Sequence, residues 1–405
     1  MHINNSDTNK ITSDGRFFLN IKFGGEDIFV NSSTLKELTI VQDLCYFLPM
    51  FTLSIKDNTG DLTHTIPFDR GMSKVYIELA KDFQSEDRNS WDFMVHKRIP
   101  SSDQSQPYGI YTIKGLLNLD KIFSPSYSRG FNQSIFTTLE SIAKEFGVDK
   151  TEISSSLAYT KNLLQPNWYN LQFLNYLTEN LIGKNGESAY RTFIKCLNQK
   201  STFVFKSLDE LILSPVKFKF ILRDTLYEDR YPIYNYSIID NYKVYSTFSS
   251  KTQNYSYYNY SSGTFVTGSV EATDFVSTTD FFLIDQNDTT DSIALEETGR
   301  STDFTSNFQG KVKTDTYNKL NDLVKIWITT QGIPNICPGD TVEIFFPQGA
   351  IADKLYSYQY SGYWLVERTV HMVGDTFLTR LLLTRTGVDT DISNTLMRST
   401  TKKKD

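Results

Sequence analysis

Apolar and polar residues alternate along most of the first third of the chain. In MFTLSIK (50–56) every second residue is apolar, so Phe51, Leu53 and Ile55 would share one face of a strand. KVYIELA (74–80) repeats this alternation, RFFLNIKF (16–23) and EDIFV (26–30) are short apolar runs, and YGIYTIKGLLNL (108–119) supplies another strand. Turn residues such as Gly24-Gly25 and the run 57–60 separate these segments. The pattern predicts five or six strands forming a small barrel or sandwich.

The period changes to that of a helix near residue 132. SIFTTLESIAKEFG (134–147) spaces its apolar residues at helical intervals, and Gly147 can end the helix. NWYNLQFLNYLTENLIG (167–183) predicts a second helix, capped by Asn167 and ended by Gly183. Its apolar stripe contains Trp168, Leu171, Leu174 and Leu181. STFVFKSL (201–208) and ILSPVKFKFIL (212–222) return to strands, so the middle of the chain is expected to be an α+β module packed on a local core.

From Tyr231 to about Gly310 the chain is polar and rich in tyrosine. We expect an irregular β segment whose tyrosines bury the ring and keep the hydroxyl in water. A carbohydrate-stacking surface is the alternative reading. Residues 286–303 are expected to form a mobile loop.

Strong strand patterns return in the last third. LVKIWITT (323–330) and TVEIFFP (341–347) are predicted strands, joined by a connection that contains Pro338-Gly339, a turn dipeptide. Two long apolar-rich runs then flank Gly374-Asp375 between residues 361 and 387, which predicts a hairpin. The basic end TTKKKD is expected to be solvated.

Composition supports a β-rich protein without a nucleic-acid-binding face. Aromatic residues make up 14% of the 405 residues, and they suit half-buried pleated surfaces. The net charge of −6 lacks the basic balance of a nucleic-acid binder. The three cysteines are too few and too far apart for a disulfide framework or a CxxC metal site. No signal peptide or membrane-spanning run is visible, so folding in a reducing cytoplasm and no membrane insertion are expected.

The chemistry-bearing motifs of common enzymes are absent from the sequence. The four histidines, His2, His64, His96 and His371, form no HxH, HxxxH or HExxH pattern. There is no GxSxG elbow, no phosphate loop and no GxGxxG after a strand. A catalytic carboxylate pair stays open, because such pairs meet only in space. We expect no enzyme, no cofactor and no metal, and we interpret His371 as a hydrogen-bonded structural residue.

The order of these elements resembles the central hub proteins of contractile phage tails, the T-even baseplate hub family, and the N-terminal half of VgrG spike proteins. The resemblance rests on layout and on a set of residues in two places. The turn and barrel-strand set is Pro338, Gly339, Asp340, Gly362, Tyr363, Leu365, Val366 and His371, and the module-helix set is Trp168, Tyr169, Phe173 and Leu174.

The resemblance implies an α+β, mainly β fold with two tube-protein-like β-barrels. The expected divisions are a first barrel (1–125), an α+β module (126–215), a discontinuous second barrel (216–250 and 310–390), an inserted irregular β subdomain (251–309) and a flexible tail (391–405). The chain lacks the needle that follows this fold in VgrG, so the spike is expected to be a separate polypeptide.

The function that the resemblance implies is structural. Three chains would form a pseudo-sixfold ring that joins the hexameric tail tube to a trimeric central spike. Tail tube, spike, baseplate wedge and tape-measure proteins would be its partners, in a virion assembled in the host cytoplasm. DNA would pass through without specific binding, aided by an acidic bore. A hub of a non-contractile tail or contractile injection system, a glycan- or receptor-binding sandwich and a wall-degrading enzyme are the alternatives.

Overall fold

The computed structural model has the mainly β architecture that the sequence predicts. The residues that it describes are 17–23, 26–27, 34–57, 73–81, 87–101, 109–119, 121–122, 125–222, 230–240, 252–259, 263–271, 290–293, 304–322, 324–346 and 360–386. The predicted turns at Gly24-Gly25 and residues 58–60, most of the loop 286–303, and the tail 391–405 lie outside these residues.

The first part of the chain forms seven antiparallel strands in the spatial order β3-β4-β7-β6-β5-β1-β2. They are β1 (Phe18–Phe23), β2 (Glu26–Asp27), β3 (Leu35–Asp43), β4 (Met50–Asp57), β5 (Lys74–Ala80), β6 (Arg88–Ser101) and β7 (Gly109–Leu117). The burial pattern of β4 alternates at every residue, as its sequence predicts. The sequence reading did not single out β3 or β6.

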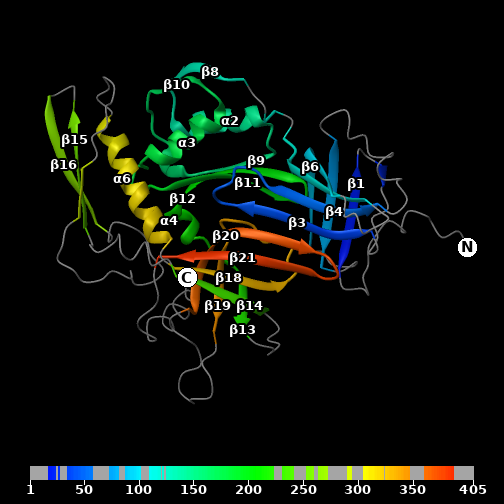
Figure 1. Cartoon of the computed structure of the whole chain (residues 1–405). Coiled ribbons are helices and arrows are strands. Elements are labelled where there is room, and N and C mark those ends of the chain that lie inside the picture. The colour runs from blue at the N-terminus through cyan, green and yellow to red at the C-terminus, as the bar shows by residue number, and fades with distance from the viewer. Residues whose placement is uncertain are drawn as a thin grey trace, which may run out of the picture.

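A closed six-stranded barrel follows, in the order β19-β13-β14-β18-β21-β20 and back to β19. Its strands are β13 (Val216–Leu222), β14 (Tyr231–Asp240), β18 (Val324–Gln331), β19 (Thr341–Phe345), β20 (Gly362–Val373) and β21 (Phe377–Arg385). The predicted hairpin is confirmed, with Val373 paired to Phe377 at its turn. β20 also pairs with β3, so the barrel continues into the first sheet (Figure 1).

The two halves share one strand arrangement. The order β3-β4-β7-β6-β5 is matched by β14-β18-β21-β20-β19, with each strand in the same sequential rank and every neighbouring pair antiparallel. We call each set of five strands a β repeat. The strands that lie beside β5 and β19 differ, because β1 runs antiparallel to β5 whereas β13 runs parallel to β19.

Irregularities in the ladders occur at equivalent places in the two repeats. One extra residue enters β6 between Val95 and Lys97, and one enters β20 between Val366 and Arg368. Another pair of bulges lies near the start of β3, after Leu35, and of β14, after Ile233. Bulges are specific features rather than accidents of pairing, so their coincidence supports a common architecture.

Equivalent hydrogen bonds confirm this alignment of the repeats. Val95 donates its backbone N–H to the carbonyl of Ser73 at 2.9 Å, one residue before β5 begins. Val366 donates likewise to the carbonyl of Asp340 at 2.9 Å, one residue before β19 begins. Aligning the bulges therefore fixes which residue of one repeat corresponds to which residue of the other.

An α+β module lies between the repeats in the chain. It contains β8 (Tyr127–Phe131), α2 (Ile135–Phe146), β9 (Lys150–Ile153), β10 (Leu163–Trp168), α3 (Asn170–Asn180), β11 (Tyr190–Leu197), β12 (Lys200–Ser207) and α4 (Leu208–Ile212). The first predicted helix is confirmed as α2, which Ser134 caps and Gly147 ends at φ 76°. In Figure 1 both longer helices lie above the sheets. The sequence did not predict the short helix α4.

The second predicted helix begins and ends elsewhere. Trp168 ends strand β10, and Tyr169 is the residue before helix α3. Asn167, the expected cap, has φ 51° and lies within the strand. The helix ends at Asn180, before Gly183. Gly183 packs too closely for a side chain, since an added Cβ would lie 2.5 Å from the Tyr190 hydroxyl.

The tyrosine-rich region contributes strands to two sheets. Tyr231–Asp240 forms β14 of the barrel. β15 (Thr252–Asn259), β16 (Thr264–Glu271) and β17 (Thr290–Ile293) form a separate three-stranded sheet. Helix α6 (Phe304–Asn321) follows, and the sequence did not predict it because its apolar residues form only a weak stripe.

A close contact between the strands of the first repeat gives a stability prediction. A Cβ on Gly115 would lie 2.5 Å from the carbonyl oxygen of Met94 and 2.3 Å from the Phe51 ring. We expect Gly115→Ala to destabilise the protein by about 1–3 kcal/mol through overpacking, seen as a lower thermal midpoint. The control is Gly130→Ala, where the nearest atom lies 3.9 Å away. Equal midpoints for the two variants would contradict this packing.

Candidate functional site

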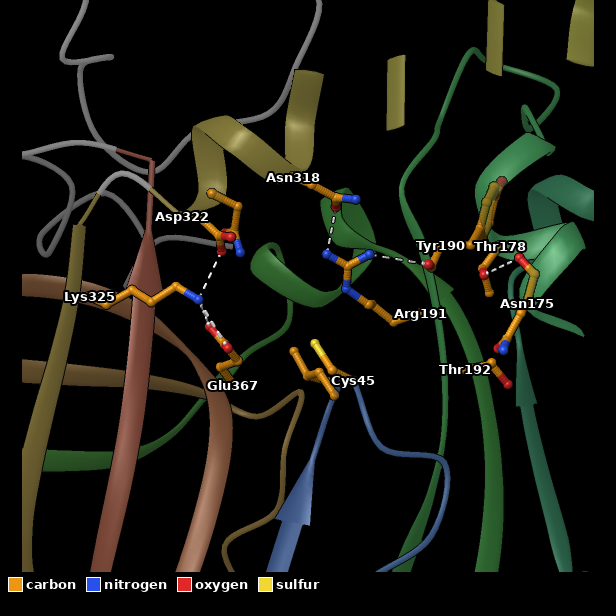
Figure 2. A pocket seen from close by; sticks show the side chains of 12 residues that line it. Cys45, Asn175, Thr178, Tyr190, Arg191, Thr192, Asn318, Asp322, Lys325 and Glu367 are labelled. Carbon is orange, nitrogen blue, oxygen red and sulfur yellow. Dashed lines mark hydrogen bonds and ion pairs between the residues drawn. The ribbon is translucent and has the colours of Figure 1, made fainter. Parts of the chain in front are cut away.

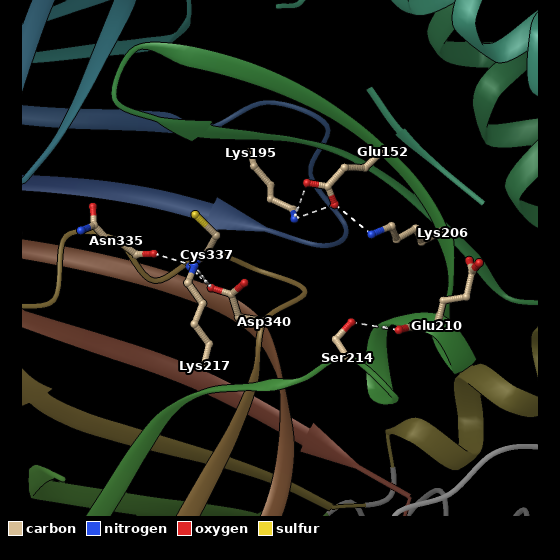
Figure 3. Close-up of polar contacts among 9 residues, drawn as sticks. All are labelled: Glu152, Lys195, Lys206, Glu210, Ser214, Lys217, Asn335, Cys337 and Asp340. Carbon is tan, nitrogen blue, oxygen red and sulfur yellow. Dashed lines mark hydrogen bonds and ion pairs between the residues drawn. The ribbon is translucent and has the colours of Figure 1, made fainter. Parts of the chain in front are cut away.

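The turn predicted from the sequence docks the start of β19 against β20. Asp340 accepts a hydrogen bond from the Cys337 N–H and an ion pair from Lys217, both at 2.9 Å (Figure 3). Gly339 donates its N–H to the carbonyl of Val366 at 2.9 Å. Its φ of 82° and the Phe193 ring 3.0 Å from an added Cβ explain why glycine occupies this position. Pro338 precedes it within the same turn.

The predicted barrel-strand residues lie together on β20. Gly362, Tyr363 and Leu365 pair with β19, opposite Ile344, Glu343 and Thr341 respectively. The backbone of Val366 binds the turn, because its carbonyl accepts the Gly339 N–H and its N–H donates to the carbonyl of Asp340. The structure thus brings the residues of the turn and of β20 into one junction.

His371 is completely buried in β20, as a structural residue would be. Its Nδ1 lies 3.3 Å from the Thr379 hydroxyl, and its ring packs near Trp91 and Phe377. Burial lowers the pKa of His371 to about 3, so the ring is neutral at physiological pH. These contacts fit a structural role.

The module-helix residues are placed in a different part of the molecule. Phe173 and Leu174 lie on the buried face of α3, and both are completely buried. Trp168 packs its ring 5.5 Å from that of Tyr176, whereas Tyr169 is exposed. The structure does not bring this set to the turn and β20.

A six-pair ladder joins the two β repeats within the chain. β20 pairs antiparallel with β3 from Arg368 opposite Asp43 to Val373 opposite Leu38. Arg368 also forms an ion pair with the buried carboxylate of Asp43. The bulge at Glu367 separates this ladder from the part of β20 that pairs with β19. The first half of β20 therefore closes the barrel, and its second half joins the barrel to the first repeat.

The corresponding strand of the first repeat has no such continuation among the described residues. β6 pairs with β5 only as far as Met94, and no described strand extends the sheet past residues 97–101 on that side. We call residues 97–101 the outer edge of β6. Ile99 on this edge is 36% exposed.

A second edge lies on β14, the counterpart of β3. β13 pairs with only its first three residues, 231–233, and no described strand extends the sheet past residues 234–240. We call residues 234–240 the outer edge of β14. Three of its large apolar or aromatic residues, Tyr234, Tyr236 and Ile239, are exposed. Strand edges of this kind are surfaces for pairing with another chain.

A polar cleft of about 310 Å³ lies where β3, β11, α3, α6 and β20 approach one another (Figure 2). Lys325 contacts Glu367 and Asp322 there at 2.7 and 2.9 Å. Burial acts to lower the pKa of Lys325, but the two carboxylates raise it above its ordinary value. Arg191 donates to Asn318 at 2.6 Å. The charged groups that line the cleft hold neighbouring elements together.

Glu152 binds two lysines on the face of the α+β module (Figure 3). Lys195 and Lys206 lie 3.0 and 2.9 Å from its carboxylate. Burial acts to raise the pKa of Glu152, but the lysines lower it below its ordinary value. The contacts link β9, β11 and β12, so this cluster supports the sheet.

The described residues contain no group of three or more histidine, cysteine or acidic side chains arranged to hold a metal ion. All three cysteines are free thiols. No helix within the described ranges is long and apolar enough to cross a membrane.

Known structures with a similar fold include tail proteins. A 43 kDa tail protein of prophage MuSo2 from Shewanella oneidensis matches with a TM-score of 0.61 and 12% identity, over 92% of this chain and all of that one. A tail protein from Neisseria meningitidis matches with a TM-score of 0.59 and 9% identity, over 91% of this chain and 96% of that one. The chain has the fold of a phage tail protein.

A longer chain also has a similar fold over part of its length. The Francisella PdpA–VgrG complex matches with a TM-score of 0.50 and 9% identity, over 91% of this chain and 57% of that one. No protein-family model matches the sequence, and no curated protein is significantly similar to it. At these identities the comparisons establish the fold and leave the role to be proposed.

The resemblance implied two barrels, but the residue correspondence between the two halves and the outer edges was not predicted, although the sequence carries a signal for it. Once the bulges are aligned, VYIEL (75–79) corresponds to VEIFF (342–346), and FMVHKRI (93–99) to WLVERTV (364–370). LTIVQ (38–42) corresponds to YSIID (236–240) in the same way. Comparing the two halves of the chain with each other would have found them.

The buried histidine predicts a pH dependence of stability. The unfolded chain binds a proton on His371 with the ordinary pKa of 6.5, whereas the folded protein does so only near 3. The stabilisation from a neutral His371 is therefore present above pH 6.5 and is lost as pH falls towards 3, by about 1.4 kcal/mol per pH unit.

We expect His371→Asn to remove this part of the slope. Urea denaturation at about pH 7 and about pH 5.5 measures it, because the difference between the two pH values cancels the variant's own loss of stability. A variant that keeps the full wild-type slope would show that His371 is not the responsible group.

Proposed function

We propose that this chain is a structural hub protein of a phage tail baseplate, acting as a homotrimer that forms a pseudo-sixfold ring. The observation that carries the proposal is the β repeat, present twice with the same strand order and equivalent bulges. Three copies of a chain with two repeats supply six similar units. The tail-protein fold of the structural relatives supports a place in a tail.

The proposed ring solves a mismatch of symmetry. A hexameric tube needs six equivalent contacts, whereas a trimeric spike needs three. Six β repeats from three chains offer the tube six similar contacts on one face of the ring. The differences between the two halves of each chain offer the spike three contacts on the opposite face. The strand beside β5 or β19 is one such difference, since β1 runs antiparallel to β5 and β13 runs parallel to β19.

The proposed partners follow from this position. The ring contacts the tail tube protein, the central spike and baseplate wedge proteins, and it lets the tape-measure protein and DNA pass without specific binding. The chain acts in the virion after assembly in the host cytoplasm. We propose the divisions 1–125, 126–215, 216–250 with 310–390, 251–309 and 391–405 as its structural parts.

The bore of the ring would be lined by the sheet face that points away from the core. Along β4 and β7 this face carries Thr52, Ser54 and Thr112, which are partly exposed and neutral. It also carries Lys114 and the exposed Arg380, whose guanidinium lies 4.4 Å from the centre of the Trp327 ring. The same face carries Lys56 and, opposite Ser54, Glu37, so charges of both signs lie among neutral residues. The neutral residues offer phosphate no ion pair. The acidic bore expected from net charge stays a prediction that this face does not favour.

The fold alone accommodates two related roles. The structural relatives include tail proteins and a VgrG complex, so a hub of a non-contractile tail or of a contractile injection system is the second candidate. A neighbouring sheath gene would separate them. No cluster in the described residues favours an enzyme, and we propose none.

Mass in solution tests the proposal. We expect light scattering on purified protein to give three times the 46.5 kDa of the chain. Outer edges of strands should be covered in that assembly. A protein that stays monomeric at all concentrations, alone and with its tail tube protein, contradicts the hub.

A further inference from the structure

The ladder between β20 and β3 gives a template for a contact that the single chain cannot make. In the aligned repeats, β6 corresponds to β20 and β14 corresponds to β3. Within the chain β20 pairs with β3, but the outer edges of β6 and β14 have no strand beyond them among the described residues. The outer edges of β6 and β14 could therefore form a ladder like the one that β20 forms with β3.

Building on the ring proposed above, we propose that the outer edge of β6 pairs antiparallel with the outer edge of β14 of a second copy, in the register of β20 with β3. The bulges set that register. Glu367 corresponds to His96 on one strand, and Lys36 corresponds to Tyr234 on the other. Val370 opposite Val41 within the chain therefore predicts Ile99 opposite Ile239 between chains.

An independent ladder supports this numbering. Ser54 pairs with Thr112 between β4 and β7, and the alignment predicts that Thr329 pairs with Arg380 between β18 and β21. That pair is present. The correspondence therefore holds across the middle of the repeat and does not rest on the bulges alone.

The residues brought together suit an apolar contact between the two strands. Ile99 and Ile239 are 36% and 38% exposed in the single chain, and both are β-branched like the valines of the template. Directly opposed β-branched residues stabilise an antiparallel pair. The same register places Arg98 opposite Asp240 and Ser101 opposite Ser237. Pro100 lacks a backbone N–H, so the ladder has at most one donor fewer than its template.

The contact is head-to-tail. Each chain contributes one outer edge of each kind, so each added copy presents the same two edges again until the assembly closes on itself. A ring built in this way alternates β20–β3 junctions within chains and β6–β14 junctions between chains. The exposed apolar residues of both edges become covered together.

Disulfide trapping tests the register. In a Cys45→Ser background, which removes the exposed native thiol, we expect Ile99→Cys with Ile239→Cys to convert most of the oxidised protein into covalent dimers and trimers. Opposed strand residues bring their Cβ atoms to about 4.5–5.5 Å, within disulfide reach. The matched control is Ile99→Cys with Asn235→Cys, also exposed on β14 but about 13 Å along the strand. It should stay uncrosslinked.

A second variant keeps the test decisive if the cysteines weaken assembly. Ile99→Asp should convert the trimer into monomers with an unchanged circular dichroism spectrum, because a carboxylate would replace the apolar contact with Ile239 and lose part of its hydration there. Leu164→Asp changes an exposed leucine on β10, away from both edges, and should remain a trimer.

The outcomes separate the two proposals. A wild-type trimer that neither crosslinks through Ile99 and Ile239 nor dissociates with Ile99→Asp overturns the register but leaves the hub standing. Crosslinking of the control pair as efficient as that of the test pair also overturns the register. A wild-type protein that never assembles overturns the proposed function, and the edge pairing with it.

Discussion

An unpaired strand edge exposes a row of backbone donors and acceptors, and the whole structure depends on how this chain covers its edges. The barrel of the second half satisfies the constraint by closing on itself, β13 bridging β14 and β19. The first repeat satisfies it on one side by receiving β20 along β3. Among the edges that remain in the described strands are those of β6 and β14, the strands equivalent to β20 and β3. The bulge at Glu367 lets β20 pair with two different strands along the same edge. Its first half pairs with β19, and its second half pairs with β3.

The remaining modules support this frame. The α+β module and α6 contribute charged and polar side chains to the cleft beside β3 and β20, where Lys325 and Arg191 each contact groups from other elements. The turn at Asp340 fastens β19 to β20 and is itself held by Lys217 of β13. His371 and Trp91 fill the region between the repeats with a neutral, buried contact. Each of these sites contributes to holding the strands in place, which fits a protein whose role is its shape.

The sequence predicted most strands and the first helix because their periodicity is local. β4 alternates at every residue and α2 carries both of its end signals, so neither needs tertiary information. The second helix was predicted to begin too early, because Trp168 and Tyr169 have the apolar character of a helix face. In the structure Trp168 ends strand β10 and Tyr169 is the N-cap of α3. α6 was missed because its burial comes from neighbours rather than from an apolar stripe. The junction of β20 with β3 joins residues far apart in the chain, and no local pattern encodes such a pair.

The central claim is that two equivalent β repeats in each chain close a ring through their strand edges. Electron cryomicroscopy of the purified assembly tests it most directly. The account predicts three chains around a central bore, with six repeats related by about 60° and continuous sheets across every chain boundary. A ring whose chains meet through the inserted sheet or the α+β module, with both outer strand edges facing solvent, would contradict it.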